Sequence, residues 1–171
     1  EAKKTFDPYH PEPDAMTLHG DHANVIYQIP VHAKNISLMF LHGAGQSMRT
    51  WQTTPDGREG FQSVFLRKGY PVYLIDQPRR GDAGRATVDG TIKASPDEQF
   101  WFGQFRMGLW PKFYDNSAFA SQKDLNSFWR QMTPNTGPYN DKVIADAVTD
   151  ALKKSEGTVL VTHSQGCGPG W

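Results

Sequence analysis

The sequence predicts an α/β fold in which a mostly parallel sheet carries helices on both faces. Three β-rich apolar runs of strand length, at 36–41, 72–75 and 158–162, alternate with segments of helical periodicity. At 171 residues the chain is long enough to bury a sizeable core. Internal repeats and low-complexity segments are absent from the sequence.

The first half of the predicted sheet is encoded before residue 77. Residues 24–30 alternate apolar and polar side chains, as a half-exposed strand does, whereas 36–41 and 72–75 are nearly continuous apolar runs typical of strands buried on both faces. Between these two runs, Phe61, Val64 and Phe65 have helical spacing, and Gly69 provides a helix stop.

A second helix and strand follow near the end of the chain. Asp141 is expected to cap a helix that Gly157 ends, and the strand 158–162 comes next. The helix has an apolar stripe made of Ile144, Ala147, Val148 and Ala151.

The strand at 158–162 runs directly into a turn of small residues with Ser164 at its tip. A strand that delivers a serine onto a tight turn before a helix is the layout of a nucleophile elbow. Gly166 allows such a turn to close, although Thr162 replaces the first glycine of the usual G-x-S-x-G pattern. We therefore predict that Ser164 is a nucleophile.

A glycine-rich turn, His42-Gly43-Ala44-Gly45, follows the buried strand 36–41. Acyl-transfer chemistry needs two N–H donors for the oxyanion, one from such a turn and one from the residue after the nucleophile. The predicted donors are the backbone amides of Ala44 and Gln165. We expect His42 to fix this turn, and His42 and Gly43 to border the substrate pocket.

Together these residues resemble the N-terminal part of an α/β-hydrolase, from about Val25 to the C-terminus. The chain is most similar to a branch of bacterial and fungal serine esterases whose elbow reads His-Ser-Gln. The matching segments are Tyr27-Gln28-Ile29-Pro30, Leu41-His42-Gly43, Trp51-Gln52-Thr53-Thr54-Pro55-Asp56-Gly57-Arg58, Phe65-Leu66-Arg67-Lys68-Gly69-Tyr70, Ile75-Asp76-Gln77 and 158–165.

The resemblance implies a serine carboxylic-ester hydrolase that works through an acyl-enzyme on Ser164. In that branch the catalytic acid and histidine lie after the elbow, so they are expected beyond Trp171, on a second polypeptide that carries the C-terminal half of the fold. This chain alone is then expected to be inactive. Two features depart from the branch: some relatives have two cysteines where Ala44-Gly45 stands, and Pro78-Arg79-Arg80-Gly81 replaces the usual Gly-x-Gly loop.

One long segment does not follow the strand–helix rhythm. Residues 100–129 contain ten aromatic side chains. They form either a helical insertion with its own small core or a cap that lends aromatic side chains to an apolar pocket, and both can hold at once. We expect a mostly helical cap in which Phe100, Trp101, Phe105 and Trp110 approach Ser164. The predicted layout is an N-terminal arm at 1–23, the core at 24–89 and 134–171, and the cap at 90–133.

Several polar residues allow a structural and a functional interpretation. His163 adjoins the nucleophile but is expected to pack and orient the elbow, because neighbours on a strand point to opposite faces. His19, Asp21 and His22 could form a metal site, but we expect them to lie in a solvated polar segment. We predict no metal or other cofactor. The arginines at 79, 80 and 85 could meet an anionic substrate, or could be solvated or paired with a carboxylate such as Asp82.

Composition excludes other classes of partner. The 18 basic and 18 acidic residues balance, so no charge excess favours nucleic acid, and no apolar run is long enough to span a membrane. We expect a small apolar ester or lactone substrate. The sequon Asn35-Ile36-Ser37 is consistent with a secreted or periplasmic protein. The alternatives are an acyl-transferring or lactone-forming or lactone-opening enzyme on the same scaffold, or an inactive hydrolase-like binding module.

Overall fold

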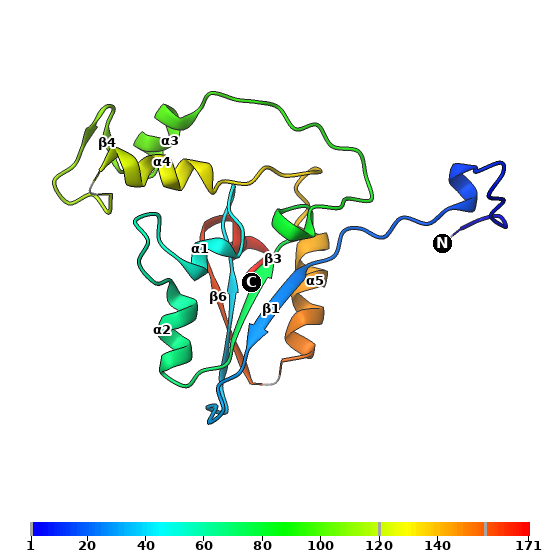
Figure 1. Ribbon diagram of the computed structural model, residues 1–171, viewed down its shortest axis with the longest axis horizontal. Helices are drawn as coiled ribbons and strands as arrows, with labels where there is room; N and C mark the ends of the chain where they lie inside the picture. Colours follow the sequence, from blue (N-terminus) through cyan, green and yellow to red (C-terminus); the bar gives the residue numbers. More distant parts are fainter. Residues whose placement is uncertain (1, 120, 156) are drawn as a thin grey trace.

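The computed structural model describes residues 2–119, 121–155 and 157–171, and its centre is a four-stranded sheet (Figure 1). The strand order is β1 (Asn24–Gln28), β3 (Val72–Asp76), β2 (Ser37–Leu41) and β6 (Thr158–Thr162). Strand β2 is parallel to both β3 and β6, whereas β1 is antiparallel to β3. The predicted α/β fold with a mostly parallel sheet is confirmed.

Helices cover both faces of the sheet because the side chains of β2 alternate between them. Leu38 and Phe40 pack against the side of α1 (Arg49–Gln52) and α2 (Phe61–Arg67), where Trp51 completes a buried cluster. Met39 and Leu41 pack on the opposite face against α5 (Asp141–Lys153). All five residues of β2 are buried, as its continuous apolar run predicts.

The N-cap residue of helix α5 differs by one position from the prediction. Asn140, and not Asp141, is the N-cap, since its side chain accepts a hydrogen bond of 3.1 Å from the backbone N–H of Val143. Asp141 is the first helical residue, where a carboxylate still favours the positive end of the helix dipole.

The segment between β3 and α5 lies over the end of the sheet where the parallel strands terminate (Figure 1). Its elements are η2 (Gly81–Ala83), α3 (Glu98–Gln104), β4 (Gly108–Leu109), β5 (Lys112–Phe113) and α4 (Gln122–Arg130). Phe102, Met107 and Leu125 form a separate buried cluster within it. The segment therefore has a small core of its own, and the hairpin β4–β5 adds strand structure to the helices that were expected.

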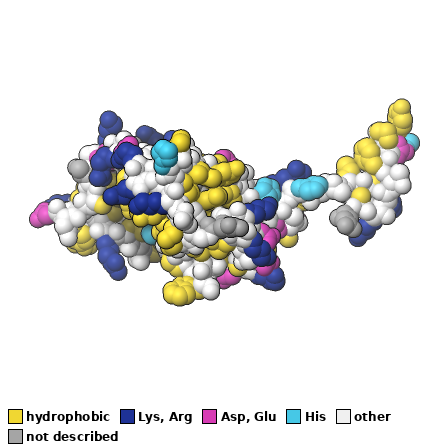
Figure 2. All heavy atoms as spheres, turned by 90° about the horizontal axis from the view of Figure 1, so that it is seen from below, with side chains coloured by type: hydrophobic (Ala, Val, Ile, Leu, Met, Phe, Trp, Pro, Cys, Tyr) yellow, Lys and Arg dark blue, Asp and Glu magenta, His cyan; other side chains and the backbone are white. Residues whose placement is uncertain are grey.

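The described part of the predicted N-terminal arm, from residue 2 on, projects away from the body of the molecule (Figures 1 and 2). This part contains η1 (Pro13–Ala15), and Lys4 forms ion pairs with Glu12 and Asp14. The chain joins the body at Asp21, whose N–H donates to the carbonyl of Arg85 at 2.9 Å. In the part of the chain that the structure describes, no helix has the length and apolar character needed to cross a bilayer.

Buried polar groups tie the ends of β2 and β3 together. The carboxylate of Asp76 accepts hydrogen bonds from the N–H of Met48 at 2.6 Å and of Asp82 at 2.9 Å. The Gln77 N–H donates to Nε2 of His42 at 3.2 Å, and its side-chain amide donates to the His42 carbonyl. These bonds fix the two loops that leave the sheet at this edge.

The imidazole of His42 is neutral in this arrangement. Its Nε2 accepts a hydrogen bond, so the 3.8 Å separation from the Asp76 carboxylate is not an ion pair. Burial lowers the pKa of His42 from its ordinary 6.5 to about 4, with the hydrogen bond to Gly43 opposing and the charge of Arg80 adding to this effect. Burial raises the pKa of Asp76. The contribution of Asp76 to stability therefore grows as the pH falls, whereas the contribution of His42 shrinks.

A pH dependence of stability follows from His42. Because its pKa is lowered in the folded state, the unfolded chain binds a proton more readily between pH 6.5 and 4. The stability that neutral His42 provides is complete above about pH 6.5 and falls by about 3 kcal/mol toward pH 4. The free energy of unfolding of the wild type minus that of His42→Gln should therefore shrink on acidification. Asp76 is common to both proteins, and a difference that stays constant from pH 7 to pH 4.5 would contradict the assignment.

Candidate active site

Ser164 stands at the turn that follows β6, as predicted. Its φ of 53° lies in the left-handed region, which is uncommon for a residue with a side chain. The chain then continues as η3 (Ser164–Gly166) and α6 (Cys167–Gly170), so the predicted helical start after the serine is present. A strained serine between a strand and a helix is the geometry of a nucleophile elbow.

The glycine-rich turn after β2 lies directly against this elbow. Leu41 is paired with Thr162 in the sheet, and the His163 N–H donates to the Leu41 carbonyl at 3.1 Å. A Cβ atom on Gly43 would be 3.0 Å from Cβ of Ser164, and one on Gly166 would be 2.6 Å from the carbonyl oxygen of His42. Gly166 therefore needs glycine, because a side chain there would push the two turns apart, whereas a side chain at Gly43 would require Ser164 and His163 to shift by a few tenths of an ångström.

The backbone of the glycine-rich turn is held from the inside. Nδ1 of the neutral His42 donates to the Gly43 carbonyl at 2.9 Å. Ala44 is exposed at the tip, and Gly45 has a φ of 66°. Among the described residues, no hydrogen bond takes up the backbone N–H of Ala44 or of Gln165. Neither predicted oxyanion donor is therefore used in a hydrogen bond within the described residues, and Ala44 lines the cavity described next.

A cavity of about 900 Å³ opens above Ser164. Its floor is formed by the glycine-rich turn and the elbow, and its walls come from the segment that contains α3 and α4. The aromatic side chains that line it are Trp101, Phe105, Phe119, Phe128, Trp129 and His163. The cavity also has a charged rim that includes Lys93, Asp97, Glu98 and Arg106.

Some of the residues predicted for this site line the cavity, and others do not. Ser164, Ala44, Trp101 and Phe105 line the cavity. His42, Gly43 and Gln165 lie beneath or beside the lining, and His42 is fully buried, so it supports the turn without facing a ligand.

Phe100 and Trp110, like His42 and Gly43, were predicted at the pocket but do not line the cavity. Phe100 is 60% exposed, and Trp110 stacks edge-on to Phe102 at the hairpin, with ring centroids 5.4 Å apart. Neither lines the cavity. The aromatic residues that the prediction missed, Phe119, Phe128 and Trp129, lie on or just before α4, whose direction relative to the sheet the sequence does not indicate.

None of the described histidines is hydrogen-bonded to Ser164 in this structure. His42 has both ring nitrogens engaged within the protein. His163 lines the cavity and packs edge-on against Trp51, with ring centroids 6.4 Å apart. His163 is exposed and lines the same cavity as Ser164, so the two side chains do not point to opposite faces as expected, although the contact with Trp51 places His163 beside the elbow.

The two arginines after β3 are neither solvated nor paired with Asp82. Arg79 makes two bonds to the carboxylate of Asp21, at 2.7 and 2.8 Å, and this pair holds the pKa of Asp21 well below its usual range. Arg80 is only 3% exposed and donates to the Gly43 carbonyl at 2.9 Å and to the side chain of Gln165 at 3.3 Å. The sequence indicated Arg80 only as a possible contact for an anionic substrate or as a solvated or Asp82-paired side chain, and not its bonds to the glycine-rich turn and the elbow. Arg85 is exposed.

Asp21 was also weighed as a metal ligand with His19 and His22. Its carboxylate is taken up by Arg79 and by Thr87. No group of three or more His, Cys, Asp or Glu side chains is placed to hold a metal ion within the described residues.

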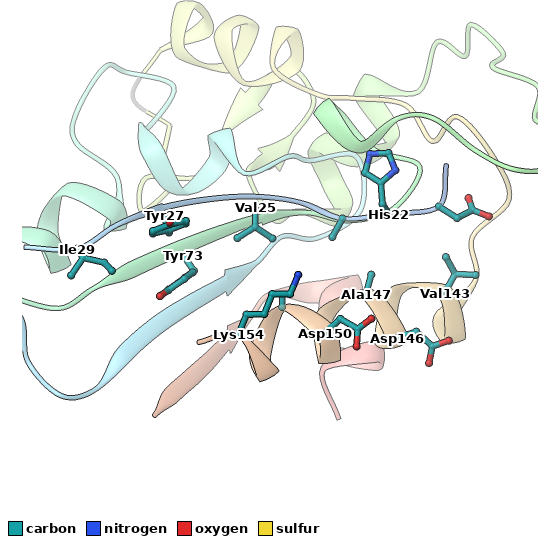
Figure 3. Close-up of a pocket in the computed structure, with 13 residues that line it drawn as sticks. His22, Val25, Tyr27, Ile29, Tyr73, Val143, Asp146, Ala147, Asp150 and Lys154 are labelled. Atoms are coloured by element: carbon teal, nitrogen blue, oxygen red, sulfur yellow. The ribbon is translucent and has the colours of Figure 1, made fainter. Parts of the chain in front are cut away.

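A second cavity of about 860 Å³ lies on the face of the sheet that carries α5 (Figure 3). Val25, Tyr27 and Ile29 face it from the side of β1, and Ala147 and Lys154 face it from α5. None of the residues of the elbow or the glycine-rich turn lines it. Of these two cavities in the described part of the chain, the one above Ser164 is therefore the candidate active site, since the serine with positive φ and the glycine-rich turn meet there.

Comparisons with known proteins find relatives of this chain among lipases and esterases. No protein-family model matches the chain. The chain is 30% identical over 143 residues to the "Probable secreted lipase phiG" of Fungal sp. (strain ATCC 74256), a match that covers 78% of this chain and 39% of that protein. It also matches the structure described as a novel bacterial esterase, with a TM-score of 0.77 and 30% sequence identity.

The structural match covers 94% of this chain and 55% of the bacterial esterase, so the chain spans about half of that relative and less of the fungal lipase. The chain is therefore homologous to a secreted lipase and to a bacterial esterase, and it forms part of an α/β-hydrolase esterase fold.

Proposed function

We propose that this chain carries the nucleophile and the oxyanion hole of a serine carboxylic-ester hydrolase. One observation carries the proposal: a serine with a φ of 53° contacts a glycine-rich turn with free N–H groups at the floor of an aromatic cavity. The homology to an esterase and a lipase supports the same class of reaction.

In this mechanism Ser164 Oγ attacks the ester carbonyl carbon while a histidine takes the hydroxyl proton. The carbonyl oxygen becomes an oxyanion, which accepts hydrogen bonds from the N–H groups of Ala44 and Gln165. Collapse of the tetrahedral intermediate breaks the bond to the alcohol, which leaves with the proton held by the histidine. Water then attacks the acyl-enzyme by the same steps and releases the acid.

The histidine and its carboxylate partner are proposed to come from outside these 171 residues. Within the described residues no histidine is bonded to Ser164, and β6 has one edge without a partner strand. Val159 on β6 is 50% exposed, which is unusual for an apolar strand of a parallel sheet. We propose that a further polypeptide segment pairs with this edge and completes the triad. The complete protein below means this chain together with that segment.

The cavity indicates the kind of ester. Its aromatic walls suit an apolar acyl or alcohol group of the ester. Lys93 and Arg106 lie at its charged rim, where a polar group of the substrate would be exposed to water. The fungal relative is named a secreted lipase, and we extend secretion to this protein on that basis and on the sequon at Asn35.

The assignment of Ser164 as the nucleophile can be tested by substitution. In the complete protein, Ser164→Ala should abolish covalent labelling by a fluorophosphonate and lower kcat for an ester by at least about a thousandfold, because the attacking oxygen is removed. Ser95→Ala is the matched control because Ser95 lines the same cavity, and this variant should be labelled to the same extent as the wild type. Labelling that persists in Ser164→Ala would refute the assignment.

The role of the aromatic wall can be tested in the same way. Phe105 lines the cavity and Phe100, on the same helical segment, does not. Phe105→Ala should raise KM for an ester with an aromatic group about 5- to 30-fold, since about 1–2 kcal/mol of apolar contact is lost. Phe100→Ala should leave KM within about twofold. Equal effects of the two substitutions would mean that the cavity is not the substrate site.

A further inference from the structure

Arg80 lies where the two proposed oxyanion donors meet. Its Nη1 donates to the carbonyl of Gly43 at 2.9 Å, and its Nη2 donates to the side chain of Gln165 at 3.3 Å and to the side-chain oxygen of Asn135. One planar guanidinium therefore joins the glycine-rich turn, the elbow and the segment that leads from α4 to α5. The fork of an arginine can hold such contacts at once, whereas a lysine ammonium cannot fix their relative directions.

The bond to Gly43 has a consequence for Ala44. In a trans peptide the C=O and the N–H of one unit point in opposite directions. The Gly43 carbonyl points into the protein, toward Arg80 and Nδ1 of His42, at 2.9 Å from each. The Ala44 N–H of the same peptide unit therefore points away from them, on the side where Ala44 lines the cavity.

We propose that Arg80 is the positioning residue of the oxyanion hole: it locks the Gly43–Ala44 peptide so that the Ala44 N–H faces the cavity. This inference rests on the proposed function and adds a residue to it. Two donors on one carbonyl also polarise the amide and strengthen its N–H as a donor. Arg80 does not touch the substrate and acts only through the peptide and the Gln165 side chain.

The environment of the guanidinium agrees with such a role. Arg80 is 3% exposed, and no ion pair among the described residues includes it. Its hydrogen-bond partners are all neutral oxygens, and the attraction from Asp76 acts over a longer range. A buried cation without a contacting counter-charge is costly for stability alone. Its positive charge is in place, however, when the oxyanion develops on the other side of the Gly43–Ala44 peptide.

The test compares Arg80→Gln with Arg79→Gln in the complete protein. Arg79 is the matched control because it lies on the same turn and is 7% exposed, yet it binds Asp21 and the carbonyl of Pro138 instead of the oxyanion turn. Arg80→Gln should lower kcat for an ester about 10- to 100-fold with KM within about threefold, which is less than the loss of a direct donor. Arg79→Gln should lower the Tm but keep kcat within about threefold.

A pair of inhibitors separates positioning from general damage. A trifluoromethyl ketone forms a tetrahedral oxyanion with the nucleophile, and its methyl ketone analogue binds without doing so. Arg80→Gln should raise the inhibition constant of the fluorinated ketone by about the factor by which kcat falls, and should leave that of the methyl ketone within about threefold of the wild-type value. If Arg80→Gln does not fold, Arg80→Lys should show the same pattern with a loss of at least about fivefold. Equal weakening of both ketones, or equal losses in the Arg79 and Arg80 variants, would overturn the inference.

The orientation can also be examined without activity. A crystal structure of Arg80→Gln should show the Gly43 carbonyl turned from its position in the wild type. A peptide that keeps its orientation would overturn the role of Arg80 even in an active enzyme. A complete wild-type protein that neither hydrolyses esters nor reacts with fluorophosphonate would instead overturn the proposed function.

Discussion

The parallel pairing of β2 with β6 is the contact on which the candidate site depends. It places Leu41 beside Thr162, so the turns that follow the two strands begin at the same level of the sheet. Gly43 then lies against Ser164, and Gly166 lies so close to the carbonyl of His42 that a side chain at Gly166 would clash with it. A shift of one residue in this pairing would separate the serine from the glycine-rich turn and turn the buried side chains of β2 toward the wrong faces.

The sheet brings the two turns together, but buried polar groups determine how their backbones are oriented. Asp76 holds the chain at Met48 and Asp82, and Gln77 fixes His42 as the neutral tautomer that donates to Gly43. Arg80 adds the second bond to the same carbonyl. Most polar atoms of these groups are bonded to loop backbone or to another buried side chain, although Nε of Arg80 and Oε1 of Gln77 have no partner among the described residues. The loss of one member would leave further polar partners buried without bonds. The network therefore links the stability of the loops to the geometry of the site.

Much of the fold and part of the site follow from local sequence patterns. Continuous apolar runs located β2 and β3, and the small residues around Ser164 predicted the elbow, because strand burial and tight turns leave a local mark on the sequence. Arg80 left no such mark, since its partners are 37 and 85 residues away in the chain. The sequence predicts the aromatic segment as a separate part of the fold. It does not predict which aromatic side chains line the cavity: Phe128 and Trp129 do, whereas Phe100 and Trp110 do not. Which face of a helix meets the sheet depends on packing between segments, which the aromatic content alone does not determine.

The central claim is that the elbow and the glycine-rich turn form one site for a tetrahedral oxyanion. The most direct measurement is a crystal structure of the complete protein after reaction with a fluorophosphonate. The account predicts a covalent bond from Ser164 Oγ to phosphorus, with one phosphonyl oxygen about 2.7–3.1 Å from the backbone nitrogens of both Ala44 and Gln165. An adduct on another residue, or an oxygen that points away from both amides, would contradict it.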